Sequence, residues 1–480
     1  MKRKLYDYPR YIHASFGSRE MFSQWFTSAF GLYTFFFYES IIGLPSEFAM
    51  AAFLIFAIWN AVNDPLIGYL MEKIKMPWQR KRDFHRFPWI LIGGLPFIFS
   101  YLLVFLIPAN WTPDTDLWKI FAWYVGSLIL FDTFYSIYDV NIASLFQAKF
   151  SKPEERRAVQ GWGTILGILG LVLTFVITGM IVKQTQPESY RQGALITFGG
   201  GFFLFLLLLP GAYENKRVRV QNRRNRAQAG DADKPFLTVA KELLANKAVR
   251  AKYILFFGYQ AAVALINASA LYVITYILDD PENNSLIFIM GAMLIGALVS
   301  TPVWVSVSQK VNNNKKISVI AGYLMFFSFL PMIFATEQWQ WIASIALFGI
   351  CLGGQWFMDP PTMGDLVDNG AVRTGKREPS LYYGFQIFIT RFSEAFKALV
   401  IAAAHMATGF VEGAPTLAQQ QAANPDGWKL MIFGIRIHTA IVPAVIVILA
   451  TIYFQKKYDL TPEKIKENRK ILDDREKSTG

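Results

Sequence analysis

The stretch ENKRVRVQNRRNRAQAGDADKP, residues 214–235, interrupts a chain of 480 residues that is 53% hydrophobic and only 17% charged. A soluble domain carries about a quarter charged residues. On both sides of this stretch the apolar residues gather into runs of roughly 20, the length that a helix needs to cross a bilayer. The runs lack the short alternating strands of a membrane barrel. The composition therefore predicts an all-α, polytopic integral membrane protein.

Twelve transmembrane segments are expected, six on each side of the polar stretch. We place them at residues 20–42, 47–71, 87–108, 117–147, 158–183, 191–212, 251–278, 284–308, 317–335, 339–366, 381–411 and 429–454. Two six-helix halves joined by a linker are the layout of the major facilitator fold, whose solute site lies near the bilayer midplane. The predicted domains are an N-terminal bundle (1–212), a cytoplasmic linker with a surface helix (213–250), a C-terminal bundle (251–455) and a cytoplasmic tail (456–480).

Basic residues gather in alternate loops. The loop after the second segment contains the run QRKRDFHR, whereas LDDPENN and ATEQW, which follow odd-numbered segments, contain no lysine or arginine. This positive-inside pattern predicts that both termini are cytoplasmic. It also explains most of the net charge of +12, so we expect a lipid bilayer rather than a nucleic acid as partner. The single cysteine, Cys351, excludes an intramolecular disulfide.

A carboxylate stands inside the second apolar segment, in IWNAVNDPLIGYL (58–70). Asn60, Asn63 and Asp64 lie at i, i+3 and i+4, so they share one helix face. A carboxylate in hydrocarbon is costly and usually marks function. Amide and carboxylate oxygens suit a small hard cation such as Na⁺, and the acid could instead carry a proton. The segment predicts a cation site; for the asparagines alone, a hydrogen-bond cluster between helices is the alternative.

The fourth segment contains a second polar cluster, FDTFYSIYDVN (131–141). Asp132, Ser136 and Asp139 lie at i, i+4 and i+7 and therefore on one side of the helix. Asp139 is near the middle of the segment and should face the protein interior. We expect Ser136 to give an oxygen to the same cation. For Asp132, closer to a water-filled vestibule, a functional and a structural role both stay open.

The eleventh segment has charges of both signs, in ITRFSEAFK. Arg391, Glu394 and Lys397 lie on neighbouring turns, and a buried arginine needs a carboxylate partner. We expect that partner to be Asp64 or Asp139 across a shared aqueous chamber, with Asp64, Arg391, Glu394 and Lys397 forming a coupling network. Local neutralisation of Arg391 by Glu394 is the alternative.

Other intramembrane side chains are weaker candidates for contact with the substrate, namely Glu20, Gln24, Gln260, Asn267 and Trp356. The chain has no phosphate-binding loop, and its four histidines are dispersed along the sequence without metal-ligand spacing. We therefore expect neither an enzyme nor a cofactor, and no metal beyond Na⁺ at Asp64. We expect a monomer whose partners are a small solute and the bilayer.

Two motif blocks resemble the glycoside–pentoside–hexuronide:cation symporters, the family of the melibiose permease, to which the animal lysolipid transporters are related. The first is IWNAVNDPLIGYL with the following FPWILIGGLPF. The second is MGDLVDNGAVRTGKREPSLYYGFQIFITRFSEA, and the tail YDLTPEKIKENRKIL is similar as well. The resemblance covers nearly the whole chain. It implies coupled import by alternating access, with a cation site between the second and fourth helices.

Carried over by position, the resemblance assigns Asp64, Asn63 and Ser136 to the cation and Asp139 to sugar and coupling. Arg391 falls where melibiose-type members have lysine. The departures are informative. Asn60 replaces an aspartate, which weakens the case for Na⁺ and makes a proton on Asp64 a rival. Two further departures are Ala143 in place of a sugar-stacking tryptophan and Gly163 in place of a sugar-binding arginine.

The sequence as a whole predicts a symporter of the cell membrane, plasma or inner, that moves a sugar or glycoside with H⁺ or Na⁺. A fixed guanidinium at Arg391 would suit an acidic sugar derivative. A carrier of an amphiphile such as a lysolipid is the first alternative. A membrane receptor that does not transport is the second.

Overall fold

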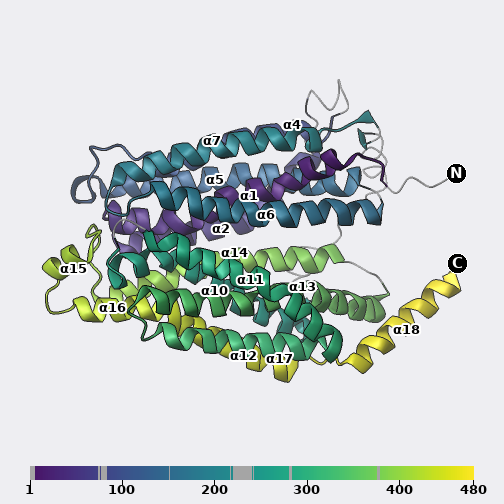
Figure 1. Ribbon diagram of the computed structural model, residues 1–480. Coiled ribbons are helices and arrows are strands. Elements are labelled where there is room, and N and C mark those ends of the chain that lie inside the picture. The colour runs from purple at the N-terminus through teal and green to yellow at the C-terminus, as the bar shows by residue number, and fades with distance from the viewer. Residues whose placement is uncertain are drawn as a thin grey trace. The chain divides into compact units, whose positions relative to one another are not determined.

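The computed structural model describes residues 6–73, 76, 84–150, 152–216, 218–219, 241, 243–280, 284–375 and 379–479, and the regular elements among them are all helices. Most of the predicted linker, 213–250, lies outside the described residues. Figure 1 shows long helices running roughly parallel within each part of the chain.

Each predicted transmembrane segment falls on one long helical rod of the described chain. The helices before the linker are α1 (Arg10–Phe36), which continues into the π-helical turn η1 (Phe37–Ile41), α2 (Ser46–Lys73), α4 (Phe87–Phe105), α5 (Pro113–Lys149), α6 (Pro153–Ile181) and α7 (Pro187–Ala212). Those after it are α10 (Lys247–Tyr272), which continues into the π-helical turn η2 (Val273–Ile277), α11 (Asn284–Val311), α12 (Asn314–Met332), α13 (Gln338–Thr374), α14 (Pro379–Thr408), the short α15 (Leu417–Ala423) and the tail helix α18 (Pro462–Thr479). Between α15 and α18, one rod is formed by α16 (Trp428–Arg436), η3 (Ile437–Ile441) and α17 (Val442–Lys457).

Ten helices among the described residues are long and apolar enough to cross a membrane. The other two long rods, α1 and α14, are those that contain Arg19 with Glu20 and the charged run from Arg391 to Lys397. Helix α1 begins at Arg10, about ten residues before the first predicted membrane segment. Helices α5, α6 and α7 each begin at a proline, whose fixed φ suits a first helical turn and whose missing N–H is not needed there.

The described chain forms two compact units, α1 to α7 and α10 to α18, and residues Val411–Gln419 belong to the first unit although they follow α14. In the first unit, α1 packs on α6 and α7, and α4 packs on α5 and α7. In the second, α10 packs on α14 and α17, and α12 packs on α13 and α17. The corresponding helices of the two halves therefore pair in the same way, a repeat that sequence similarity did not reveal.

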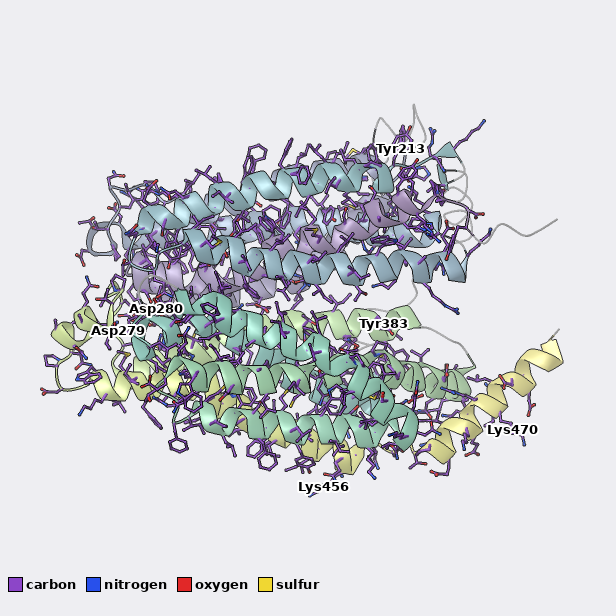
Figure 2. All side chains as sticks on the ribbon, viewed as in Figure 1. Tyr213, Asp279, Asp280, Tyr383, Lys456 and Lys470 are labelled. Carbon is purple, nitrogen blue, oxygen red and sulfur yellow. The ribbon has the colours of Figure 1, made fainter. Side chains whose placement is uncertain are left out.

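The ends of α1 and α10 repeat one backbone pattern. Each helix closes with a π-helical turn, and the turn is followed by a residue at positive φ, Gly43 at 83° and Asp279 at 49°. Leu44 N donates to Tyr38 O at 2.9 Å, and Asp280 N donates to Ile274 O at 3.0 Å. Figure 2 labels Asp279 and its neighbour Asp280 at this corner. Glycine fits the left-handed conformation freely, whereas aspartate adopts it with some strain.

Residues Val411–Gln419 are fastened to the first unit near the first of these corners. Glu412 Oε1 accepts hydrogen bonds from Ser46 N at 3.1 Å and from Ser46 Oγ at 2.7 Å. Gly413 N donates to the backbone oxygen of Glu39 at 3.1 Å. The loop that follows α14 is thus held by η1 and by the first residue of α2.

Glycines let aromatic rings fill the core of the first unit. A Cβ at Gly94 would lie 2.2 Å from the Phe205 ring, and a Cβ at Gly201 would lie 2.1 Å from the Phe26 ring. Phe30 stacks on Phe131 with centroids 4.5 Å apart. This packing brings α4, α5 and α7 close together and fixes the face that α5 turns towards α2.

Candidate functional site

Helices α2 and α5 place three polar side chains of the first unit in contact. Asn63 Nδ2 donates to Asp132 Oδ2 at 3.0 Å, and Asn60 Nδ2 donates to Asp132 Oδ1 at 2.5 Å. All three residues are buried. The remaining oxygen of one amide, Asn60 Oδ1, is buried without a hydrogen-bond partner. Two of the three residues predicted to share a face of α2, Asn60 and Asn63, thus contact the same acid of α5, Asp132, whose role had been left open.

The other predicted cation ligands surround this contact along the same helices. The side chain of Asp64 lies outside the described residues, so its predicted role stays a prediction. Ser136, one turn beyond Asp132 on α5, is buried. Asp139, a further turn along, is partly buried. Within the described chain no three His, Cys, Asp or Glu side chains converge as metal ligands. Any cation here would thus rely on amide and hydroxyl oxygens beside carboxylates.

The first helix contributes an ion pair that sequence reasoning missed. Arg19 Nη2 lies 2.9 Å from Glu20 Oε1, and the Arg19 guanidinium also lies 5.2 Å from the centre of the Phe146 ring. A Cβ at Gly163 would approach Glu20 Cγ to 3.1 Å. The position where melibiose-type members have arginine therefore leaves room for Glu20. Gln24, one turn later, accepts a hydrogen bond from Ser28 Oγ at 3.2 Å.

In the second unit, α14 presents the predicted charges. Arg391 is partly buried, and one turn beyond it Lys397 Nζ forms an ion pair with Glu394. Lys397 is buried, whereas Glu394 is exposed at its carboxylate. The chamber predicted between Arg391 and the acids of α2 and α5 would join residues of different units, and it stays a prediction.

The weaker candidates of the second unit lie on α10 and α13. Gln260 and Asn267 are partly buried, and Asn267 Oδ1 is a buried oxygen without a hydrogen-bond partner. Trp356 is 40% exposed, whereas Trp304 is buried and donates from Nε1 to Ile350 O at 2.8 Å.

Two histidines described above as dispersed meet in the second unit. His405 Nε2 lies 3.2 Å from His438 Nε2, and Ser269 Oγ lies 2.7 Å from His438 Nδ1. The π-helical turn η3 contains His438, and such turns re-aim the side chains that they contain. Separation along the chain was therefore a poor guide to separation in space.

A buried charged cluster of the second unit also escaped sequence reasoning. Lys252 of α10 pairs with Asp359 of α13, Nζ to Oδ1, at 2.5 Å. Tyr259 of α10 and Gln386 of α14 donate to the same carboxylate. The sequence held a signal, because Asp359 is an acid in an apolar run directly before two prolines.

Residues 15–461 match the profile of a family described as "MFS/sugar transport protein". The chain belongs to this family. Inner membrane symporter YicJ of Escherichia coli (strain K12) is 24% identical over 447 residues, which cover 91% of this chain and 88% of that protein. The glucuronide carrier protein homolog of the same organism is 23% identical over 459 residues, covering 92% and 90%.

The fold agrees with this membership. The crystal structure of a D-xylose–proton symporter superposes with a TM-score of 0.59 at 12% sequence identity, covering 93% of this chain and 97% of that one. The predicted major facilitator fold is confirmed. The chain is a multi-pass membrane transporter, not an enzyme.

Proposed function

We propose that the small cation which this symporter moves together with a sugar or glycoside binds at the contact between α2 and α5, and that this cation is Na⁺. The observation that supports the proposal is the buried, unpartnered Asn60 Oδ1 beside Asp132. A buried oxygen without a donor costs about 1–3 kcal/mol. A protonated Asp132 would offer a single O–H donor here, whereas a cation held at this contact would take oxygens from the amide and the acid together.

The charge balance of the site supports the same ion. Asn60 stands where melibiose-type members have an aspartate, and its amide cannot supply the lost negative charge. Asp132 compensates from α5, because its two oxygens lie against Asn60 and Asn63. Carboxylate, amide and hydroxyl oxygens form the donor set that hard cations prefer. Asp64 and Ser136 would complete it.

The binding of the cation and the binding of the sugar would be coupled through the residues that both ligands use. Asp132 attracts the two amides of α2, and a bound cation competes with those amides for its charge. Any shift of α2 against α5 then reaches Asp139, two turns further along the same face of α5, where the sugar is expected. By linkage, the sugar must raise cation affinity by the same factor as the cation raises sugar affinity.

The name of the glucuronide carrier homolog indicates an acidic glycoside for that protein. Arg391 would suit such a substrate here, because a guanidinium binds a carboxylate bidentately. We therefore include uronates among the substrates to be tested, beside neutral sugars. The basic loops place both termini on the cytoplasmic side in this proposal.

The test uses purified protein in liposomes with a Na⁺ gradient, a proton gradient or neither. We expect uphill sugar accumulation with Na⁺ and at least a tenfold loss in Asn60→Ala and Asp132→Asn. Asp114→Asn, an acid-to-amide change at an exposed position, is the matched control and should accumulate normally. Accumulation driven by the proton gradient alone would refute Na⁺, and full accumulation by Asp132→Asn would refute the site.

A further inference from the structure

Asp359 is the centre of a polar cluster within the second unit, inside the predicted span 339–366. Its Oδ1 accepts hydrogen bonds from Lys252 Nζ at 2.5 Å and from Tyr259 OH at 3.0 Å. Its Oδ2 accepts one from Gln386 Nε2 at 2.8 Å. Three helices, α10, α13 and α14, therefore meet at one carboxylate. The proposed cation site uses none of the residues of this cluster.

The burial of the ion pair is unequal. The Lys252 side chain is 3% exposed, whereas that of Asp359 is 14% exposed. The ammonium lies behind the carboxylate and neutralises it, so the cluster has no net charge. A ligand that reaches the cluster meets carboxylate oxygens first. Because the charges already balance, the cluster does not call for an ionic ligand.

The cluster has more hydrogen-bond acceptors than donors. An ionised carboxylate offers about four lone-pair positions, and Asp359 uses three of them. Gln386 Oε1 is buried without a partner. Pro360 and Pro361 follow Asp359 directly and have no N–H. The backbone oxygen four residues before each proline therefore receives no α-helical hydrogen bond from it.

Such a local excess of acceptors at membrane depth calls for donors supplied by a ligand or by water. Backbone without its ladder bonds is tolerated within the bilayer only where it is buried in protein or faces a water-filled space. The missing partners are neutral donors. Sugar hydroxyls are neutral donors, and carboxylate and amide oxygens are the acceptors that orient them.

Two aromatic side chains lie one helical turn before the polar groups. Trp356 precedes Asp359 on α13 and is 40% exposed, and Tyr383 precedes Gln386 on α14 and is 43% exposed. Figure 2 labels Tyr383 on α14. At a spacing of three residues, each aromatic shares a helix face with its polar neighbour. Flat apolar rings beside acceptors match a sugar, whose C–H face is apolar and whose edge is hydroxylated.

We propose that Asp359 and Gln386, backed by Lys252 and Tyr259, form a hydroxyl-binding subsite for the transported sugar in the second unit. The inference rests on the proposed function and deepens it. It assigns the polyhydroxylated part of the substrate to this subsite and leaves Arg391 for an acidic group. An amphiphile with one short polar head would not satisfy these acceptors.

The test measures the thermal stabilisation of purified protein by a fixed panel: D-glucose, D-galactose, D-xylose, D-glucuronate, methyl β-D-glucoside, lactose and melibiose. A ligand that binds the native state raises the unfolding midpoint, so a titration gives its affinity. Losing a hydrogen bond to a charged group should weaken the best sugar at least about tenfold in Asp359→Asn. Gln386→Met, which keeps the ion pair, should weaken it as well, and Asp459→Asn, an exposed acid in the tail, should not.

Monodeoxy derivatives of the best sugar then identify the contact. One derivative should bind the wild-type protein about tenfold more weakly than the parent sugar does. The same derivative and the parent sugar should bind Asp359→Asn with equal affinity, because the partner of that hydroxyl is already gone. If Asp359→Asn and Gln386→Met bind the sugar as wild type does, water completes the acceptors and the subsite is refuted, while sugar transport stands. If no sugar protects wild type, the subsite is refuted together with the proposed substrate class.

Discussion

Breaking the Lys252–Asp359 ion pair should destabilise the second unit more than removing both of its charges. Loss of one partner from a buried pair costs about 3–5 kcal/mol, because the remaining charge is left in a poorly solvating interior. Asp359→Asn leaves the ammonium, whose side chain is only 3% exposed, and we expect a loss near the upper end. Lys252→Met leaves a carboxylate that keeps two other donors, so about 3 kcal/mol is expected.

The double variant Lys252→Met/Asp359→Asn contains neither charge. Its amide still offers an oxygen to Tyr259, and the unpartnered Gln386 Oε1 can accept from the new NH₂ group. We therefore expect it within about 1 kcal/mol of wild type, as charge-free replacements of buried pairs often are. A loss of 4 kcal/mol corresponds to a midpoint lower by about 10 °C for a unit of roughly 240 residues.

The assay is heating in detergent with a thiol-reactive fluorophore. Cys351 is the single cysteine of the chain, and it is buried on α13, so its reaction reports unfolding of the second unit. The expected order of midpoints is wild type, double variant, Lys252→Met, Asp359→Asn. A double variant as unstable as the worse single variant would show that the pair contributes nothing as a pair.

Three further predictions concern stability. Asp279→Gly should raise the free energy of unfolding by about 0.5–1 kcal/mol, because the residue has a φ of 49°, which glycine adopts without strain. Gly43→Asp at the equivalent corner should lower the free energy of unfolding, and the same thermal assay measures both. Gly94→Ala should cost at least about 1–3 kcal/mol, since its Cβ would lie 2.2 Å from the Phe205 ring, and an unchanged midpoint would contradict the packing described for α4. Burial lowers the pKa of Lys149, at the end of α5, from 10.5 to about 8, so the native state releases this proton first, and stability should rise as the pH increases from about 8 to 10.5. A pKa lowered to about 8 corresponds to about 3 kcal/mol, and Lys149→Met should show a smaller rise over this pH range in denaturant titrations.

The predictions from sequence succeeded where the signal was local. Apolar runs of helical length gave the helices, since each run must bury its own backbone hydrogen bonds in lipid. The division into six and six helices at the polar stretch 214–235 stays a prediction. The spacing of Asn60 and Asn63 placed them on one face, and the structure shows that face meeting Asp132.

Sequence reasoning failed where partners come from distant helices. Lys252 and Asp359 are 107 positions apart, and His405 and His438 were judged dispersed although their rings touch. The repeat between the halves also lies in which helices pair rather than in which residues recur.

By itself, the sequence determined the membrane class, the number of long helices, the family and the polar faces of α2 and α5, because hydropathy and helical periodicity act over a few turns. Only tertiary structure decided which acid meets Asn60, which base neutralises Asp359, and which oxygens remain without donors. Those outcomes depend on how each helix is rotated against its neighbours, and that rotation is set by the packing of glycines and aromatic rings summed over whole helices.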